Sequence, residues 1–298
     1  MRFPLLLLFT IVLSGFSAMA DAPDYFGPYV FAPGTSQSIF SDTAYIRSAP
    51  QSSAGAIDSM YAFESLRIVK QMKEQLTLGR KAAPWYQVSF QRNGSPRLGY
   101  LWGGALALKA IRHQGAQFAA GILSYPDPAA FTKDDSGADL RYMNTFSIKA
   151  KSGTVRDECR FNISRESAYF YEETDSNGVV NDRHVQAAKG LPPGASFVVS
   201  FGMSGEACGI PSYTIAAAWD GSHLIRLPLI ESNADGGEWA YEESFIFPSQ
   251  QGGKPGLLRI KAVSESAIEN SDKMKTEVSW REYRYDAGAK KFVRLPAP

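Results

Sequence analysis

Apolar and polar positions alternate along residues 83–104, and no other stretch of the chain carries so clear a structural signal. Side chains alternate between the two faces of a strand. One face therefore holds Trp85, Gln87, Ser89 and Gln91, and the other holds Tyr86, Val88 and Phe90. Asn93-Gly94 follows directly, and both residue types tolerate the positive φ that a type I′ turn requires. The pattern predicts a β-hairpin whose return strand contains Leu98, Tyr100 and Trp102.

Similar short patterns separated by Gly, Pro, Asn and Asp predict strands along most of the remaining chain. The expected strands are residues 43–47, 65–69, 117–125, 142–151, 154–163, 169–171, 196–201, 213–219, 223–229, 239–247, 256–263 and 277–285. Residues 70–83 are polar, and there we expect a long loop or a short helical turn. Residues 213–227 and 280–295 share an aromatic–strand–Asp-Gly–strand order, from either duplication or two independent turns. The fold class is therefore mainly β, with a small barrel followed by a larger antiparallel β domain, a sandwich or a propeller-like meander.

The first twenty residues have the form of a secretory signal peptide. Arg2 precedes an apolar run of about 14 residues, shorter than the ~20 that a spanning helix needs. Ala18-Met19-Ala20 matches an A-x-A cleavage site. We expect cleavage after Ala20, a periplasmic or secreted mature protein and no membrane segment after signal removal.

The mature length fits two domains. Removing residues 1–20 from 298 leaves 278 residues. Residues 21–38 are rich in Pro and Gly and form a leader, residues 39–112 form the small barrel, and residues 116–298 form the larger β domain.

The charge is almost balanced, with 31 basic and 30 acidic residues in the whole chain. Without Arg2 the two numbers are equal, and no basic block is present. A neutral chain of this kind argues against nucleic acid or an anionic membrane surface as the main partner.

Two cysteines, Cys159 and Cys208, would enter an oxidising compartment together. Paired cysteines of exported proteins usually form disulfides, and this bridge would close a loop of about fifty residues. We expect a structural Cys159–Cys208 disulfide; the alternatives are two free thiols or one nucleophilic thiol.

The chain carries no convincing catalytic constellation. His113, His184 and His223 lack metal-ligand spacing, and residues 202–206 lack the final glycine of a nucleophile elbow. The acidic candidates for glycoside hydrolysis are Glu172-Glu173, Asp235, Glu238 and Glu242-Glu243. Adjacent residues of a strand point to opposite faces, so the two Glu-Glu pairs do not form facing carboxylates. We therefore expect a non-enzymatic protein without a metal or another cofactor.

Four short motifs in order resemble the bacterial SH3 family. They are Tyr45-Ile46-Arg47-Ser48-Ala49-Pro50, then Leu66-Arg67-Ile68-Val69, then Trp85-Tyr86-Gln87-Val88, then Gly99-Tyr100-Leu101. The resemblance covers about a quarter of the chain. It departs from the usual pattern in two places. Ala44-Tyr45 stands where the family usually has Asn before the hydrophobic-Arg pair, and the stretch 70–84 is longer than in most members of the family. The resemblance implies an SH3-like barrel that recognises a cell-wall peptide or a partner peptide.

Aromatic rings with polar edges suit the recognition of an extended peptide. Such a groove could be lined by Tyr45, Arg47, Tyr86, Tyr100 and Trp102. Among these, Tyr86 and Trp102 are the preferred contacts. Trp85 and Tyr100 are instead expected to fill the barrel. The expected function is recognition of a peptide, peptidoglycan or an envelope protein. The alternatives are a cell-envelope hydrolase or inhibitor acting through residues 116–298, and a structural scaffold with no ligand in the groove. The sequence carries no indication of the oligomeric state.

Overall fold

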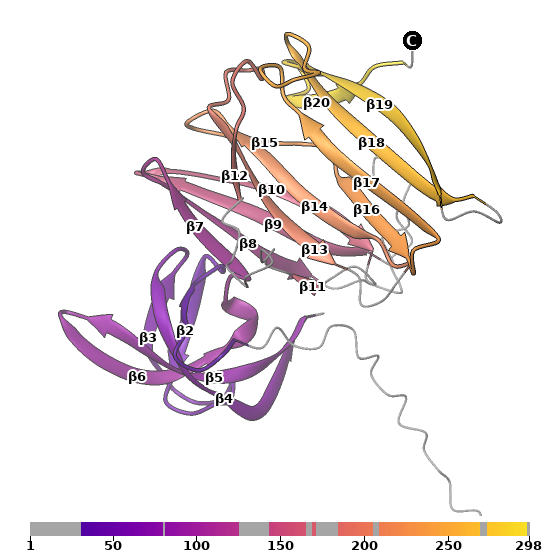
Figure 1. Ribbon diagram of the computed structural model, residues 1–298. Coiled ribbons are helices and arrows are strands. Elements are labelled where there is room, and N and C mark those ends of the chain that lie inside the picture. Colours follow the sequence, from indigo (N-terminus) through magenta and orange to yellow (C-terminus); the bar gives the residue numbers. More distant parts are fainter. Residues whose placement is uncertain are drawn as a thin grey trace, which may run out of the picture.

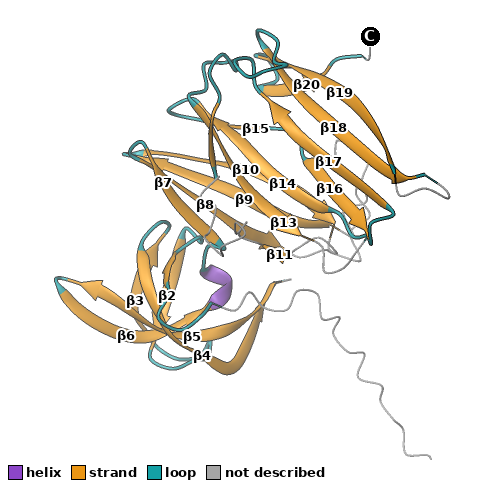
Figure 2. Ribbon diagram, in the orientation of Figure 1, coloured by secondary structure: helices purple, strands orange, loops and turns teal. Residues whose placement is uncertain are grey.

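A computed structural model describes residues 31–79, 81–124, 143–164, 169–170, 184–204, 209–268 and 273–296. The expected signal peptide, residues 21–30 of the leader and Cys208 lie outside the described residues. Apart from one 3-10 turn, Gly103–Ala105, every regular element in the described part is a strand (Figure 2). The expectation of a mainly β, antiparallel fold is therefore confirmed. Across the same residues, no helix has the length and apolar character needed to cross a bilayer.

The first unit, called the half-barrel below, is a strongly curved six-stranded sheet with the order β1-β4-β5-β6-β2-β3 (Figure 1). Its strands are β1 (Ser36–Ser38), β2 (Thr43–Arg47), β3 (Ala56–Tyr61), β4 (Ser65–Leu78), β5 (Lys81–Arg92) and β6 (Ser95–Trp102). The two ends of the sheet meet around Ile39. The Phe63 N–H donates to the Ile39 carbonyl at 2.8 Å, and Ile39 forms an isolated bridge with Leu106.

The predicted hairpin of residues 83–104 is confirmed as β5 and β6. Arg92 pairs with Ser95, so Asn93 and Gly94 alone form the turn, with φ of 52° and 76°. Tyr86, Val88 and Phe90 all point into the core of the half-barrel. The alternation in the sequence therefore identifies the two faces of this hairpin correctly.

The expectation of a loop or helical turn at residues 70–83 is wrong. Strand β4 continues to Leu78, and β5 already begins at Lys81, so this stretch is a second hairpin. Register shifts between Ile68 and Lys70 and between Gln71 and Gln75 interrupt the ladder. Most residues of β4 beyond Ile68 are exposed on both faces, so this half of the strand has no hydrophobic alternation to reveal it.

The second unit, called the sandwich below, contains a four-stranded and a ten-stranded antiparallel sheet (Figure 1). The smaller sheet has the order β10-β9-β8-β7 and comprises β7 (Lys109–His113), β8 (Ala116–Ser124), β9 (Met143–Ser152) and β10 (Val155–Ser164). Because β7 pairs with β8, residues 109–112 belong to this unit, although the sequence analysis groups them with the small barrel.

The larger sheet follows the order β11-β13-β14-β16-β17-β18-β19-β20, with β12 beside β13 and β15 beside β14. Its strands are β11 (Tyr169–Phe170), β12 (Val185–Ala187), β13 (Phe197–Ser204), β14 (Ser212–Trp219), β15 (Leu224–Arg226), β16 (Ile230–Asp235), β17 (Trp239–Ile246), β18 (Leu257–Ala267), β19 (Met274–Asp286) and β20 (Lys291–Arg294). The two halves of the possible internal repeat are the hairpins β14–β15 and β19–β20.

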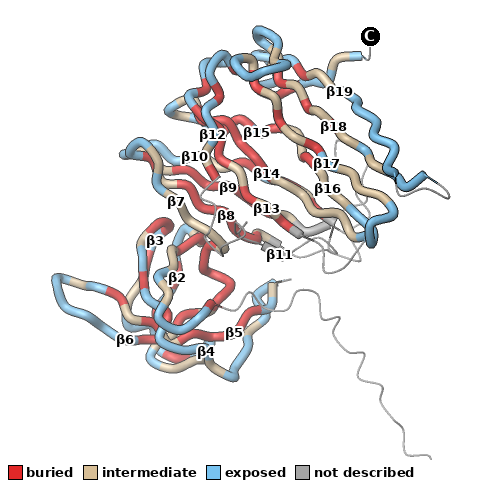
Figure 3. Tube along the Cα trace, in the orientation of Figure 1, coloured by how far each residue is buried: buried red, intermediate tan, exposed pale blue. Residues whose placement is uncertain are grey.

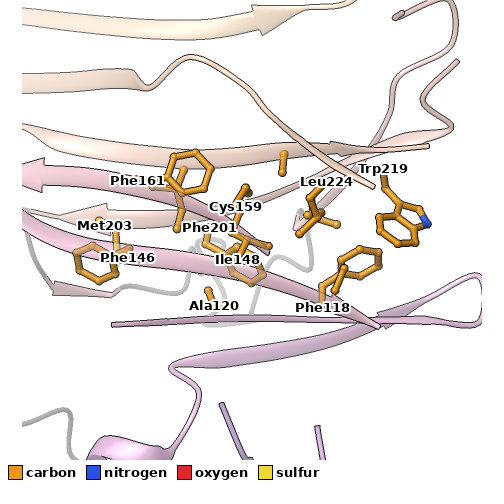
Figure 4. Close-up of a cluster of buried hydrophobic side chains, with 14 of the residues drawn as sticks. Phe118, Ala120, Phe146, Ile148, Cys159, Phe161, Phe201, Met203, Trp219 and Leu224 are labelled. Carbon is orange, nitrogen blue, oxygen red and sulfur yellow. The ribbon is translucent and has the colours of Figure 1, made fainter. Parts of the chain in front are cut away.

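The main core of the sandwich lies between the four-stranded sheet and strands β13 to β15 (Figure 4). Phe118, Phe146 and Phe161 come from the smaller sheet, and Phe201 and Trp219 come from the larger one. The opposite face of β13 and β14 is also buried, in a second core with β17 and β18. The run Ala216-Ala217-Ala218 suits this position, because small side chains let layers approach β14 from both sides.

The half-barrel packs against the outer face of the four-stranded sheet. Phe40 and Phe63 join Ala119 of β8 in one apolar cluster. A Cβ on Gly121 would lie 2.6 Å from the Phe40 ring, so only glycine allows this approach. Lys149 of β9 donates to Asp42 at 2.7 Å, and its Nζ lies 4.9 Å from the Phe40 ring centroid. The two units are therefore joined by a packed interface as well as by the chain.

Candidate binding surface

The outer face of the half-barrel gathers exposed apolar and aromatic side chains from β2 and β6. Tyr45 is 57% exposed and Leu98 is 58% exposed, whereas Tyr100 and Arg47 are half-buried. Arg47 pairs directly with Tyr100 across the two strands, so the two side chains lie on one face. Tyr45, Arg47, Leu98 and Tyr100 are called the outer patch below.

Two observations show that the outer patch is a continuous surface of the sheet. Tyr100 also pairs with Gln87 of β5, and Leu98 pairs with Ser89 of the same strand. Gln87 and Ser89 are both polar residues of the outward face. Ile46, the residue between Tyr45 and Arg47, is fully buried. The period of the pleat therefore separates the outer patch from the core.

Arg47 also has a structural contact. Its Nη1 donates to the Ala54 carbonyl at 2.5 Å, which ties the loop of residues 48–55 to β2. A guanidinium has five N–H donors, so this bond leaves donors for a carboxylate or a carbonyl of a ligand. Arg47 is thus positioned by the protein before any ligand arrives.

Trp102 is held by its own sheet. The indole Nε1 donates to the Leu76 carbonyl at 2.8 Å, and the ring packs against the backbone of Gly104. Lys81 places its Nζ 5.8 Å from the ring centroid. These contacts leave Trp102 half-buried, so its first role is to join β4, β6 and the 3-10 turn.

Tyr86, which the sequence analysis placed in the groove, is a core residue. Its side chain is completely buried, its hydroxyl accepts from the Phe31 N–H at 3.3 Å, and the Phe31 ring packs edge-on against it. Burial raises the pKa of Tyr86. Tyr86 therefore does not line the groove, because the curvature of the sheet turns the Tyr86–Val88–Phe90 face inward. In Figure 3 much of β5 is coloured as buried.

Tyr100 takes the place on the surface that the sequence analysis gave to Tyr86. The sequence predicts that Tyr100 and Trp85 both fill the barrel. Trp85 is 2% exposed, but it pairs with Trp102 on the face of β5 opposite Tyr86, Val88 and Phe90, and the core of the half-barrel does not include it. Tyr100 is half-buried and faces outward beside Arg47. The spacing between Leu98, Tyr100 and Trp102 shows that they share a face, but the sequence does not show which face of the sheet is outside.

Cys159 is a free thiol, so the expected Cys159–Cys208 disulfide is absent from this structure. Its side chain is 8% exposed and points into the main sandwich core beside Phe161 and Ile148 (Figure 4). Burial raises the pKa of the thiol to about 12. A thiol with this pKa is no nucleophile at neutral pH.

A polar cluster interrupts the inner face of β16, β17 and β19. Glu243 is 8% exposed, forms an ion pair with Arg281, and accepts from the Tyr241 hydroxyl and from the Glu231 N–H. Burial and the Glu243 charge raise the pKa of Glu231, and burial with the Glu243 hydrogen bond raises that of Tyr241 to about 12. Because the Glu243 carboxylate already has these three partners, we interpret the cluster as a structural network.

The three histidines occupy separate environments. His113 packs edge-on against Phe197, His184 contacts the Ser200 carbonyl through Nδ1 at 2.9 Å, and His223 lies 3.6 Å from Asp220 in the β14–β15 turn. In the residues described, no group of three or more His, Cys, Asp or Glu side chains is arranged to hold a metal ion.

Comparison of the chain with protein-family models, with curated proteins and with solved structures found no match.

Proposed function

We propose that this protein is an exported binding protein whose half-barrel is an SH3-like module that recognises an extended peptide of the cell envelope. The observation that carries the proposal is the outer patch, where Tyr45 and Leu98 are more than half exposed beside Arg47 and Tyr100. Aromatic rings on an open sheet offer flat apolar area and polar edges, which suit an extended main chain. Arg47 adds a positive charge for a carboxylate of the ligand.

The arrangement of the four motifs supports the SH3-like part of the proposal. Residues 45–47 lie in β2, residues 66–69 in β4, residues 85–88 in β5 and residues 99–101 in β6. These strands are neighbours in one curved sheet, in the order β4-β5-β6-β2. Motifs from separate parts of the sequence thus contribute to a single small module.

Export rests on the signal-like residues 1–20 and is part of the same proposal. We expect the mature chain to begin at Asp21 and to reside in the periplasm or outside the cell. N-terminal sequencing of protein recovered from the envelope fraction tests this point. An intact Met1 terminus in that fraction would contradict cleavage after Ala20.

Co-sedimentation with purified peptidoglycan sacculi tests the binding function. We expect the protein to pellet with sacculi and Tyr45→Ala to weaken the interaction by about five- to thirtyfold, since an anchoring ring contributes roughly 1–2 kcal/mol. Leu98→Ala should also weaken binding. Leu78→Ala is the matched control, because Leu78 is 49% exposed at the far end of β4, outside the outer patch.

Failure to pellet would refute the peptidoglycan version of the proposal. The same series should then be repeated with envelope proteins captured on the immobilised chain, again comparing Tyr45→Ala with Leu78→Ala. Trp102→Ala is unsuitable for this comparison, because Trp102 holds β4 and β6 together and its loss would change the fold as well.

The scaffold alternative has one observation in its favour. The apolar cluster around Phe40 and Phe63 docks the half-barrel on the sandwich, as expected of a module that stabilises its own chain. This alternative predicts that Tyr45→Ala and Leu98→Ala leave every interaction unchanged. The outer patch lies on β2 and β6, and Tyr45 and Leu98 stay more than half exposed although the half-barrel is docked, which is why we favour binding.

A further inference from the structure

Among the residues that the structure describes, strand β19 has a long unpaired edge. It pairs with β18 from Met274 to Arg284, but the short strand β20 covers only residues 283–286 on the other side. Residues 274–280 are exposed without interruption, and Figures 1 and 3 show this part of the β18–β19 hairpin at the outer edge of the sandwich. An edge of this kind offers free N–H and C=O groups for pairing with another strand.

The direction of these backbone groups follows from one hydrogen bond. The Leu295 N–H donates to the Glu282 carbonyl at 2.8 Å on the open side of β19. Backbone groups of successive residues alternate between the two sides of a strand, and the β18–β19 register has no bulge. Met274, Thr276 and Val278 therefore turn their N–H and C=O groups toward the open edge.

The edge is complementary to itself in one antiparallel register. If Thr276 faces Thr276 of a second copy, Met274 lies opposite Val278 and Lys275 lies opposite Glu277, twice by symmetry. Lys275 and Glu277 already form an ion pair at 2.6 Å within one chain, so they share a face and would form a square of alternating charges in the dimer. Facing Val278 with Val278 instead would place Lys275 opposite Arg281, which is unfavourable.

We propose that the β19 edge of one chain pairs with the β19 edge of a second copy, giving a two-fold dimer with a continuous sheet across residues 274–278. The backbone bonds supply the attraction, the Lys275–Glu277 pairs fix the register, and the Met274–Val278 contacts add apolar area on the outer face. This inference is independent of the binding function proposed for the half-barrel, which lies in a different sheet.

Charge reversal provides the main test, with the molar mass followed by light scattering over a concentration series. We expect a dimer for the wild type and a dissociation constant raised about tenfold or more for Lys275→Glu or Glu277→Lys alone, since each places four like charges together. The double exchange Lys275→Glu with Glu277→Lys restores the square and should restore the dimer. Both side chains are more than 60% exposed, so none of these variants should disturb the monomer.

A backbone variant gives an independent test. Thr276→Pro removes the N–H that would donate at the two-fold axis, and it leaves the β18 ladder intact because this N–H faces away from β18. Thr276→Ala keeps the N–H and serves as its control. We expect Thr276→Pro to be monomeric and Thr276→Ala to remain dimeric.

Three results would overturn the proposal. One is a wild-type chain that stays at monomer mass at the highest soluble concentration. Another is a dimer that both single reversals leave unchanged, which would place the contact on a different surface. The third is a β19 edge that binds a heterologous extended peptide while the chain stays monomeric.

Discussion

The surroundings of Cys159 strongly alter the chemistry of its thiol. It lies on β10 within the main sandwich core, and burial raises its pKa to about 12. At pH 8 the folded protein therefore holds almost no thiolate at this position, and reagents have little access to it.

We expect Cys159 to resist alkylation by iodoacetamide at pH 8 in the folded protein and to react once the chain is unfolded, without any reductant. Mass spectrometry of the peptide that contains Cys159 gives the readout. A thiol that stays unlabelled in denaturant and reacts only after reduction would mean that the Cys159–Cys208 bridge forms, contrary to the free thiol of the structure.

The exchange between Tyr86 and Tyr100 shows the limit of sequence reasoning at the residue scale. Alternation correctly separates the two faces of β5, but it assigns no inside or outside to them. Tyr86 is buried because the half-barrel closes around Ile39, and that closure depends on long-range contacts with residues 62–64 and 105–106. Tyr45 and Arg47 were predictable as surface residues from their alternation with the buried Ile46.

Strands whose residues alternate clearly between apolar and polar positions were predictable, and strands without this alternation were not. Strand β2 has the predicted bounds, and β9 and β10 form the predicted hairpin. The strand β16 and the outer half of β4 were missed, because their residues are mostly half-buried or exposed and show no clean alternation. Such strands form because a neighbouring strand supplies hydrogen bonds, which composition does not reveal.

The turn of the β5–β6 hairpin gives a prediction at the element scale. Gly94 has φ of 76°, a conformation that a β-branched residue strongly disfavours. Gly94→Val should lower the free energy of unfolding by about 1–2 kcal/mol through backbone strain. Urea unfolding measures the change, and Gly55→Val, in an exposed loop with open space around the glycine, is the control. Equal losses in both variants would contradict a type I′ turn at Asn93-Gly94.

At the scale of the molecule, composition and strand pattern predict two β units, and the interface between them is the feature that sequence could not supply. In the sequence, Phe40 is an ordinary apolar residue before the predicted strand 43–47. Gly121 is a residue of low strand propensity within the predicted strand 117–125. Only the fold brings them into contact, together with the Asp42–Lys149 ion pair. The Lys149 hydrogen bond and charge lower the pKa of Asp42.

Lys81 also bridges the two units. Its Nζ donates to the Gly104 carbonyl of the half-barrel at 2.5 Å and to the Ile122 carbonyl of the sandwich at 2.7 Å. It lines a cavity of about 20 Å³ together with Phe31, Leu108 and other apolar residues. Burial, and to a smaller extent the Lys149 charge, lowers the pKa of Lys81 to about 8, from a normal value of 10.5.

This lowered pKa makes the attachment of the half-barrel depend on pH. Between pH 8 and 10.5 the unfolded chain holds the Lys81 proton more strongly than the folded chain, so the Lys81 contribution to stability increases as the pH rises. Relative to Lys81→Met, the wild type should gain about 2 kcal/mol in the free energy of unfolding from pH 7 to 9.5. Groups common to both proteins cancel in this difference.

Lys73→Met, at an exposed position of β4, should follow the wild type at every pH. Parallel curves for the wild type and Lys81→Met in urea unfolding would show that Lys81 titrates normally, and that burial at the interface between the two units does not penalise its charge.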